Sequence, residues 1–167
     1  MNRTGLRRRV ERMGFAAFRH TPRGLRQRLV RLIKPSFTVG VMPIVTRDDG
    51  AILLVRHSYL DGWGFPGGLI NRREQFDVAL LRETREEVGV EIELVGEPAV
   101  TLHPNHQIVR IVQRAKLAPG VDPASARPSS QEIVEVWWCP VGQVPSLLDE
   151  ATGALAALTR SEGMRKG

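Results

Sequence analysis

Three glutamates, Glu83, Glu86 and Glu87, stand at positions i, i+3 and i+4 of a segment with helical periodicity. Side chains at these spacings share one side of a helix, so three carboxylates there repel one another. They also precede Gly89 in the last helical turn, where the helix dipole disfavours negative charge. Local stability does not explain this cluster. A bound hard cation such as Mg²⁺ or Mn²⁺, which takes oxygen ligands, does explain it.

The helix that carries these glutamates is expected over residues 75–88. Phe76, Ala79 and Leu80 form an apolar stripe one turn earlier, of the kind that packs against a sheet. The glutamates continue that stripe and therefore face the protein. A solvated acidic face is the usual interpretation of an arbitrary acidic run, and the residues around this run argue against it.

Residues 68–90 resemble the Nudix box, the loop–helix–loop motif of the Nudix hydrolases. The match includes the glycine and charged positions of that motif, which here are Gly68, Glu74, Arg82, Glu83, Glu86, Glu87 and Gly89. Thr84 stands where the motif usually has an aliphatic residue. Arg73 replaces a glycine common in relatives, which removes an easy positive-φ position, so we expect this loop to adopt another turn.

The resemblance implies metal-dependent hydrolysis of a pyrophosphate bond in a nucleoside diphosphate linked to another moiety, with Mg²⁺ or Mn²⁺ as cofactor. The alternative is a non-catalytic Nudix domain that binds nucleotide metabolites or RNA. The implied metal ligands are Gly68, Glu83, Glu86 and Glu87. Arg82 and Glu74 are implied as the residues that brace these ligands.

A further glutamate late in the domain often completes such a site or acts as the base. Glu132 and Glu135 have opposite strand parity, so only one of them should face the cleft. We expect Glu135, with Glu132 as the alternative, to join Glu83, Glu86 and Glu87 as a catalytic residue. The general base stays open among Glu83, Glu135 and Glu132.

Two further residues are expected to contact the substrate. Arg56 ends a strand shortly before the glycine-rich loop, where its guanidinium suits a phosphate or a base edge. Phe65 is placed to stack on a base. A solvated arginine and a core phenylalanine are the alternatives.

The implied fold is α/β, the Nudix α/β/α sandwich with a mixed β-sheet. The sequence agrees, because strand-like runs occupy residues 36–45, 51–58, 91–95, 99–103, 107–117 and 131–140, and a covering helix is expected within 144–160. We assign residues 35–160 to this domain, 161–167 to a C-terminal tail and 1–34 to a basic, amphipathic helical extension.

The net charge of +6 is unevenly distributed over the 167 residues. Residues 1–34 hold eleven of the 24 Lys/Arg but only one of the 18 Asp/Glu, so the remaining chain is mildly acidic. Three roles for residues 1–34 stay open: packing on the domain or in a homodimer, binding an acidic partner such as nucleic acid or a membrane surface, and a disordered tail.

The sequence also indicates the compartment. Cys139 is the single cysteine, which excludes an internal disulfide framework and suits a reducing environment. No apolar run is long enough for a transmembrane segment, and no apolar segment of a signal peptide follows the basic N-terminus. We therefore expect a cytoplasmic protein that acts on a small-molecule nucleotide.

Overall fold

The computed structural model describes residues 22, 24, 36–103 and 106–164. The expectations for residues 1–34 and 165–167 therefore lie outside the described residues, apart from two single positions. Along the chain the elements are β1 (Thr38–Thr46), β2 (Ile52–His57), β3 (Gly68–Leu69), α3 (Phe76–Val88), β4 (Ile92–His103), β5 (Ile108–Leu117), the short 3-10 helix η2 (Pro123–Ser125), β6 (Ile133–Cys139) and α4 (Asp149–Gly163).

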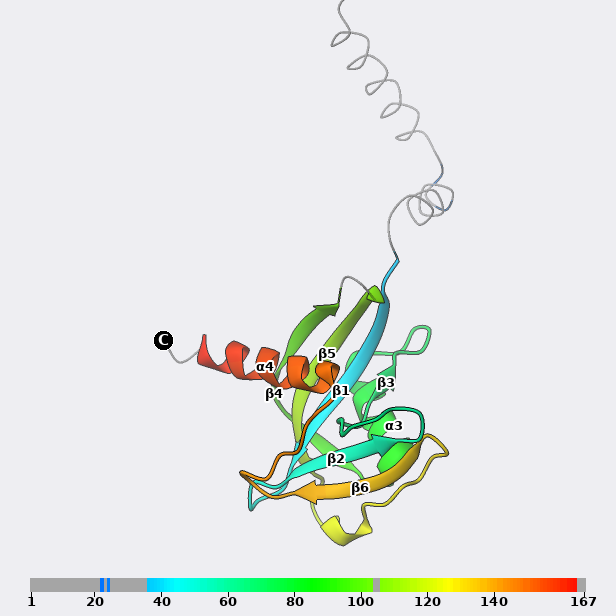
Figure 1. Cartoon of the computed structure of the whole chain (residues 1–167). Coiled ribbons are helices and arrows are strands. Elements are labelled where there is room, and N and C mark those ends of the chain that lie inside the picture. The colour runs from blue at the N-terminus through cyan, green and yellow to red at the C-terminus, as the bar shows by residue number, and fades with distance from the viewer. Residues whose placement is uncertain (1–21, 23, 25–35, 104–105, 165–167) are drawn as a thin grey trace, which may run out of the picture. The chain divides into compact units, whose positions relative to one another are not determined.

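The strands form one sheet in the order β4-β5-β1-β2-β6, with the short β3 paired to β1 (Figure 1). β1 and β5 are parallel, and the other pairs are antiparallel. The turn between β1 and β2 ends at Gly50 (φ 84°), and Asp49 Oδ1 accepts a hydrogen bond from the Ala51 N–H at 3.1 Å. The predicted mixed sheet is confirmed.

Alternation along β1 divides the core into two layers. Met42 and Ile44 belong to a cluster that includes Ala151, Ala154 and Leu158 of α4. Val41 packs with Ala79 and Leu80 of α3 on the opposite face. The sheet therefore lies between α3 and α4, and the predicted α/β/α arrangement is confirmed.

The predicted acid-rich helix is also present. Gln75 is its N-cap residue, and Gly89 ends it in the left-handed region with φ 73°. Among the stripe residues, Ala79 and Leu80 are fully buried and Phe76 packs beside them. The helix therefore rests its first turns on the sheet and presents its last turn to the region beside β3.

The structure differs from the expected boundaries in two places. β4 is one strand with an irregularity between Val95 and Ala99, where two separate strands were expected. α4 runs to Gly163, so it continues past the expected domain end at residue 160. Two arginines of β5 pair with this helix: Arg110 contacts Glu150 in its first turn, and Arg114 contacts Glu162 in its last.

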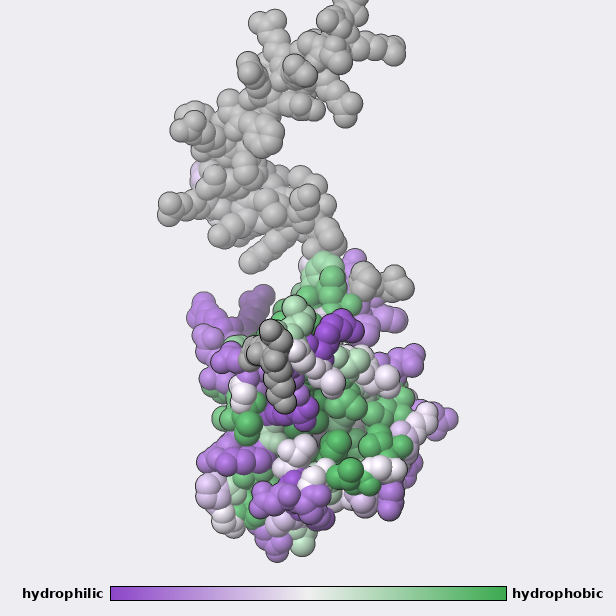
Figure 2. Space-filling model, turned by 90° about the vertical axis from the view of Figure 1, so that its left-hand side faces the viewer, coloured by the Kyte–Doolittle hydropathy of each residue, from purple (hydrophilic) through white to green (hydrophobic). Residues whose placement is uncertain are grey.

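The surface is mixed in polarity. Figure 2 shows hydrophobic residues gathered in the middle of one face, with hydrophilic residues around them. Large apolar side chains are also exposed on the edge strand β4, at Val95, Val100 and Leu102. Within the residues described, no helix has both the length and the apolar character required to cross a membrane.

Candidate active site

A cavity of about 470 Å³ lies where α3 meets β1, β2 and the loop before β3. It brings together three of the four expected metal ligands, Gly68, Glu83 and Glu87, and adds Glu132. Its other charged or titratable side chains are His57, Tyr59, Arg110 and Glu150. The acid-rich helix and the glycine-rich loop thus line the same cavity, and they touch where the Gly67 N–H donates to Glu87 Oε2.

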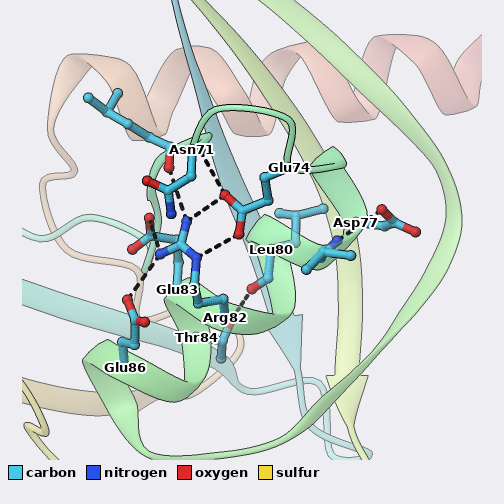
Figure 3. A network of polar contacts seen from close by, with 10 residues as sticks. Asn71, Glu74, Asp77, Leu80, Arg82, Glu83, Thr84 and Glu86 are labelled. Atoms are coloured by element: carbon cyan, nitrogen blue, oxygen red, sulfur yellow. Dashed lines mark hydrogen bonds and ion pairs between the residues drawn. The ribbon is translucent and has the colours of Figure 1, made fainter.

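Arg82 lies at the centre of the polar contacts beside this cavity (Figure 3). Its Nε donates to Glu74 Oε1 at 2.7 Å, and its Nη1 lies 2.9 Å from Glu83 Oε1 and 3.0 Å from Glu86 Oε2. Its Nη2 also donates to the Leu69 carbonyl at 3.1 Å. We call Glu74, Arg82, Glu83 and Glu86 the Arg82 network. Arg82 thus contacts Glu74 and two of the three helix glutamates.

Two carboxyl groups of the Arg82 network have shifted pKa values. Hydrogen bonds from Arg82, and then from the Asn71 N–H, lower the pKa of Glu74 to about 2. Burial raises the pKa of Glu83, against the opposing contact with Arg82. A Cβ at Gly68 would lie 2.5 Å from the Glu83 carboxylate, so a larger residue there would displace the end of this side chain.

Glu87 occupies the buried side of the same helical turn. Its side chain is only 6% exposed, and Oε2 accepts a hydrogen bond of 2.9 Å from the Gly67 N–H. Burial, reinforced by Glu83, Glu132 and Glu86, raises its pKa to about 8. This carboxylate therefore sits in negative surroundings.

Glu86, the third box glutamate, points away from the cavity. Its side chain is 57% exposed and pairs with Arg82 one turn earlier in α3. It does not line the cavity. The helix therefore turns two of its three predicted ligands, Glu83 and Glu87, toward the protein and leaves the third at the rim.

Glu132, the alternative to Glu135, lies in this cavity beside a histidine, His57. Ligand atoms of His57, Glu87 and Glu132 lie within 4.8 Å of one another, and we call these residues the cavity cluster. His57 is 8% exposed, and burial lowers its pKa. Tyr59 donates its hydroxyl to Glu132 Oε2 at 3.3 Å.

The expectation that Glu135 faces the cleft is corrected, because Glu132 lines the cavity and Glu135 does not. Glu135 pairs with Arg56 at 2.7 Å across β2 and β6, and both side chains are about half exposed. Arg56 likewise lies outside this cavity, next to a shallower one. The charges of these two residues therefore balance each other at the surface.

A β-bulge between Arg56 and His57 changes the strand register here, which a regular alternation along the sequence does not reveal.

Phe65 is part of the core, as the alternative interpretation held. It is 2% exposed and packs in the cluster that α4 covers, although it borders the cavity. A ring this deeply buried has little face available for stacking on a base.

The loop before α3 keeps a conformation that the sequence analysis expected it to lose. Arg73 has φ 65°, so it adopts the left-handed region without a glycine. The turn is closed by two hydrogen bonds between its ends: Glu74 N–H donates to the Asn71 carbonyl at 3.1 Å, and Asn71 N–H donates to Glu74 Oε2 at 2.7 Å. The expectation of another turn is wrong, because these contacts and Arg82 hold the loop.

The donor set of the cavity fits a divalent cation. Mg²⁺ and Mn²⁺ take carboxylate and carbonyl oxygens, and Glu83, Glu87 and Glu132 supply carboxylates beside the backbone of Gly67 and Gly68. Burial, with neighbouring glutamates, raises the pKa of Glu87 and so disfavours its ionised form. A bound cation would offset this effect by stabilising the ionised form.

A second cavity of about 350 Å³ lies beside the first. The two cavities share Leu60, Arg110 and Glu150, and Arg110 Nη1 donates to Glu150 Oε2 at 2.7 Å. The second cavity is otherwise lined by His103, His106, Ile108, Leu148 and Asp149. A ligand in the carboxylate cavity therefore has space beside it for a further chemical group.

The fold and the cavity define an α/β/α domain in which an acid-rich helix faces a carboxylate-lined hollow. The family model of the NUDIX domain matches residues 36–160, and the chain belongs to the Nudix family. The family prediction from residues 68–90 is thereby confirmed.

Several known proteins are similar to this chain. A MutT-like protein of Streptomyces ambofaciens is 31% identical over 106 residues, covering 64% of this chain and 66% of that protein. An RNA pyrophosphohydrolase of Stutzerimonas stutzeri (strain A1501) is 47% identical over 55 residues, or 33% of this chain and 35% of that protein. These alignments thus span between about a third and two thirds of the relatives' lengths. The crystal structure of a MutT NUDIX hydrolase from Burkholderia pseudomallei matches with a TM-score of 0.61 and 24% identity, over 74% of this chain and 99% of that one, which supports the fold.

Proposed function

We propose that this protein hydrolyses a pyrophosphate bond in a nucleoside diphosphate linked to another moiety, with Mg²⁺ or Mn²⁺. The observation that carries the proposal is the convergence of Glu83, Glu87 and Glu132 on one cavity that the backbone of Gly67 and Gly68 also lines. Similarity to a protein named RNA pyrophosphohydrolase supports the same class of reaction.

Glu87, Glu132 and the Gly68 carbonyl are the groups that would hold a cation. When bound, the cation neutralises phosphate charge and lowers the pKa of a water molecule. The Gly67 N–H fixes the orientation of the Glu87 carboxylate, and the Tyr59 hydroxyl does the same for Glu132. Both acids are thus held in place before a substrate arrives.

Glu83 is our choice for the general base among the open candidates. It borders the cavity, and burial raises its pKa, which brings a carboxyl closer to the acidity of an effective base. Arg82 holds its orientation through the contact at 2.9 Å. Glu83 would accept the proton of the water that attacks phosphorus, and no covalent nucleophile is needed.

The remaining part of the substrate would occupy the second cavity. Arg110 lies between the two cavities, so its guanidinium is the phosphate contact that we assign in place of Arg56. Asp149 and Glu150 add carboxylates that can accept hydrogen bonds from a base or a sugar. These residues, outside the box, would set substrate preference.

A substrate panel tests this proposal. Phosphate or pyrophosphate release would be followed with Mg²⁺ or Mn²⁺ on ADP-ribose, sugar nucleotides, an oxidised guanosine triphosphate, diadenosine polyphosphates and triphosphate-ended RNA. We expect turnover of at least one class by the unchanged chain and by Glu135→Gln, and its loss in Glu87→Gln. Equal turnover by Glu87→Gln, or no cation-dependent release from any compound, would contradict the proposal and favour a binding module.

A further inference from the structure

The three residues of the cavity cluster come from three different elements. His57 ends β2 and shares strand parity with Leu53 and Val55, which pack in the cluster that includes Val88 of α3. Glu132 directly precedes β6, and its carbonyl accepts a hydrogen bond from the Ser58 N–H at 2.8 Å. Glu87 is fixed by α3. The sheet therefore holds the imidazole and one carboxylate opposite the carboxylate of the helix.

The imidazole of His57 has an unsatisfied atom. Its Nδ1 is buried and has no hydrogen-bond partner within the part of the chain that the structure describes. Most buried polar atoms do have a partner, and leaving one unpaired costs free energy. His57 is only 8% exposed, and it lines the cavity together with Glu87 and Glu132. One nitrogen of the ring lies within 4.8 Å of carboxylate oxygens of Glu87 and Glu132, so a cation bound between these atoms would give the imidazole a partner.

Separations within 4.8 Å suit ligand atoms that surround one small cation. Two carboxylates alone would provide a site of oxygen ligands, which suits Mg²⁺. An imidazole changes this preference, because nitrogen ligands are bound more strongly by first-row transition ions than by Mg²⁺. The Arg82 network is less suited to such an ion, because a guanidinium already contacts its carboxylates.

We propose that His57 is a nitrogen ligand of the catalytic cation, together with Glu87 and Glu132, and that it makes this cavity prefer Mn²⁺ or another first-row transition ion to Mg²⁺. This inference rests on the proposed function, because it concerns the cation of the same cavity. The sequence offers no spacing signal for this ligand, since residues 57, 87 and 132 meet only through the sheet.

The test uses the full chain and Mn²⁺ alone, without nucleotide. Pulsed electron paramagnetic resonance detects an imidazole nitrogen bound to Mn²⁺, and a titration of free Mn²⁺ gives its affinity. We expect a nitrogen coupling in the unchanged chain, and its loss in His57→Leu and His57→Gln. Mn²⁺ affinity should fall by about tenfold or more in both variants, and Mg²⁺ affinity, measured by competition, should change by less than about threefold.

His103→Leu is the matched control, because His103 lines the neighbouring cavity and does not belong to the cavity cluster. Its Mn²⁺ complex should keep the nitrogen coupling. Circular dichroism shows whether each variant is folded, and the more conservative His57→Gln decides the matter where His57→Leu does not fold.

Absence of a nitrogen coupling in the unchanged chain would overturn the proposal, as would a coupling that persists in a folded His57 variant. These failures differ from failure of the proposed function. Turnover with Mg²⁺ but no nitrogen coupling removes His57 as a ligand and leaves the hydrolase. A coupling without turnover of any nucleotide keeps the ligand and removes the hydrolase.

Discussion

The two groups of carboxylates that meet at α3 have different surroundings. In the Arg82 network, one guanidinium contacts Glu74, Glu83 and Glu86. In the cavity cluster, burial and neighbouring carboxylates raise the pKa of Glu87 to about 8, while hydrogen bonds from Arg82 and the Asn71 N–H lower that of Glu74 to about 2. Glu83 and Glu86 of the first group and Glu87 of the second lie within two turns of one helix.

This contrast distinguishes the Arg82 network, which stabilises the fold, from the cavity cluster, which is suited to bind a ligand. Where the chain supplies its own cation, the carboxylates are satisfied and the loop beside them is fixed. Where it supplies none, buried charge is left for a ligand to balance, which costs stability until the ligand binds. The same residue type thus serves two purposes according to the position of one arginine.

The largest expected effect comes from replacing Glu132 and Glu135, one at a time. Glu132→Gln should lower turnover by about a hundredfold or more, because a group that would hold the cation loses its charge. Glu135→Gln, which removes only the exposed partner of Arg56, should keep turnover within about twofold. Initial rates of both variants on the best substrate decide this. Equal losses of turnover in the two variants would show that Glu132 has no special role in the cavity cluster.

The acidity of Glu87 gives the next effect. Because its pKa in the folded chain is about 8 against an ordinary 4.5, the folded chain keeps a proton that the unfolded chain releases between these values. Without a divalent cation, the free energy of unfolding should therefore fall as pH rises through this window, by a few kcal/mol, on the order of one per pH unit.

Urea unfolding at several pH values measures this fall. His57, whose pKa is lowered from 6.5, acts in the opposite direction up to about that pH, so the effect of Glu87 is clearest above it. Glu87→Gln should flatten the dependence and Glu91→Gln should not, since the pKa of Glu91 is lowered by Arg85. If the pH dependence of the free energy of unfolding is unchanged in Glu87→Gln, Glu87 does not have the raised pKa that we assign to it.

Removal of Arg82 tests the other half of the comparison. Arg82→Ala leaves three carboxylates in mutual repulsion and the Leu69 carbonyl without its donor, and should lower the free energy of unfolding by about 2 kcal/mol. Arg85→Ala on the same helix removes only an exposed pair with Glu91 and should have little effect. Chemical denaturation compares the two. Similar losses would mean that the Arg82 network is an ordinary surface pair.

The smallest effect concerns the loop of the Arg82 network. Arg73→Gly should raise the free energy of unfolding by about 1 kcal/mol, because glycine adopts a φ of 65° without the cost that a side chain incurs. Arg72→Gly, at a neighbouring position without positive φ, should lower it instead. Thermal unfolding of the two variants distinguishes these signs, and a loss in both would show that the turn is not under strain.

Much of this could be predicted from the sequence, and the limits have physical causes. The sequence predicted that Glu83 and Glu87 face the protein, because helical periodicity is a local pattern. The match to the Nudix box also covers many residues and is specific. The ends of β4 and α4 were missed because a strand irregularity and a helix end depend on contacts with β5. The sequence contained no sign of His57 and favoured Glu135 over Glu132, because a β-bulge sets the register of these strands. It also predicted a different turn at Arg73, because it does not show that Glu74 and Arg82 hold this loop.

The pairing of Arg110 and Arg114 with the two ends of α4 has a consequence for movement. A phosphate that takes the Arg110 guanidinium would withdraw it from Glu150, and the first turn of α4 would lose one of its ties to the sheet, while the contact of Arg114 with Glu162 would keep the last turn in place. The first turn of α4 would then open more readily than its last turn. Substrate occupancy would therefore be readable as faster amide hydrogen exchange at residues 149–153, in a helix remote in sequence from the acidic motif.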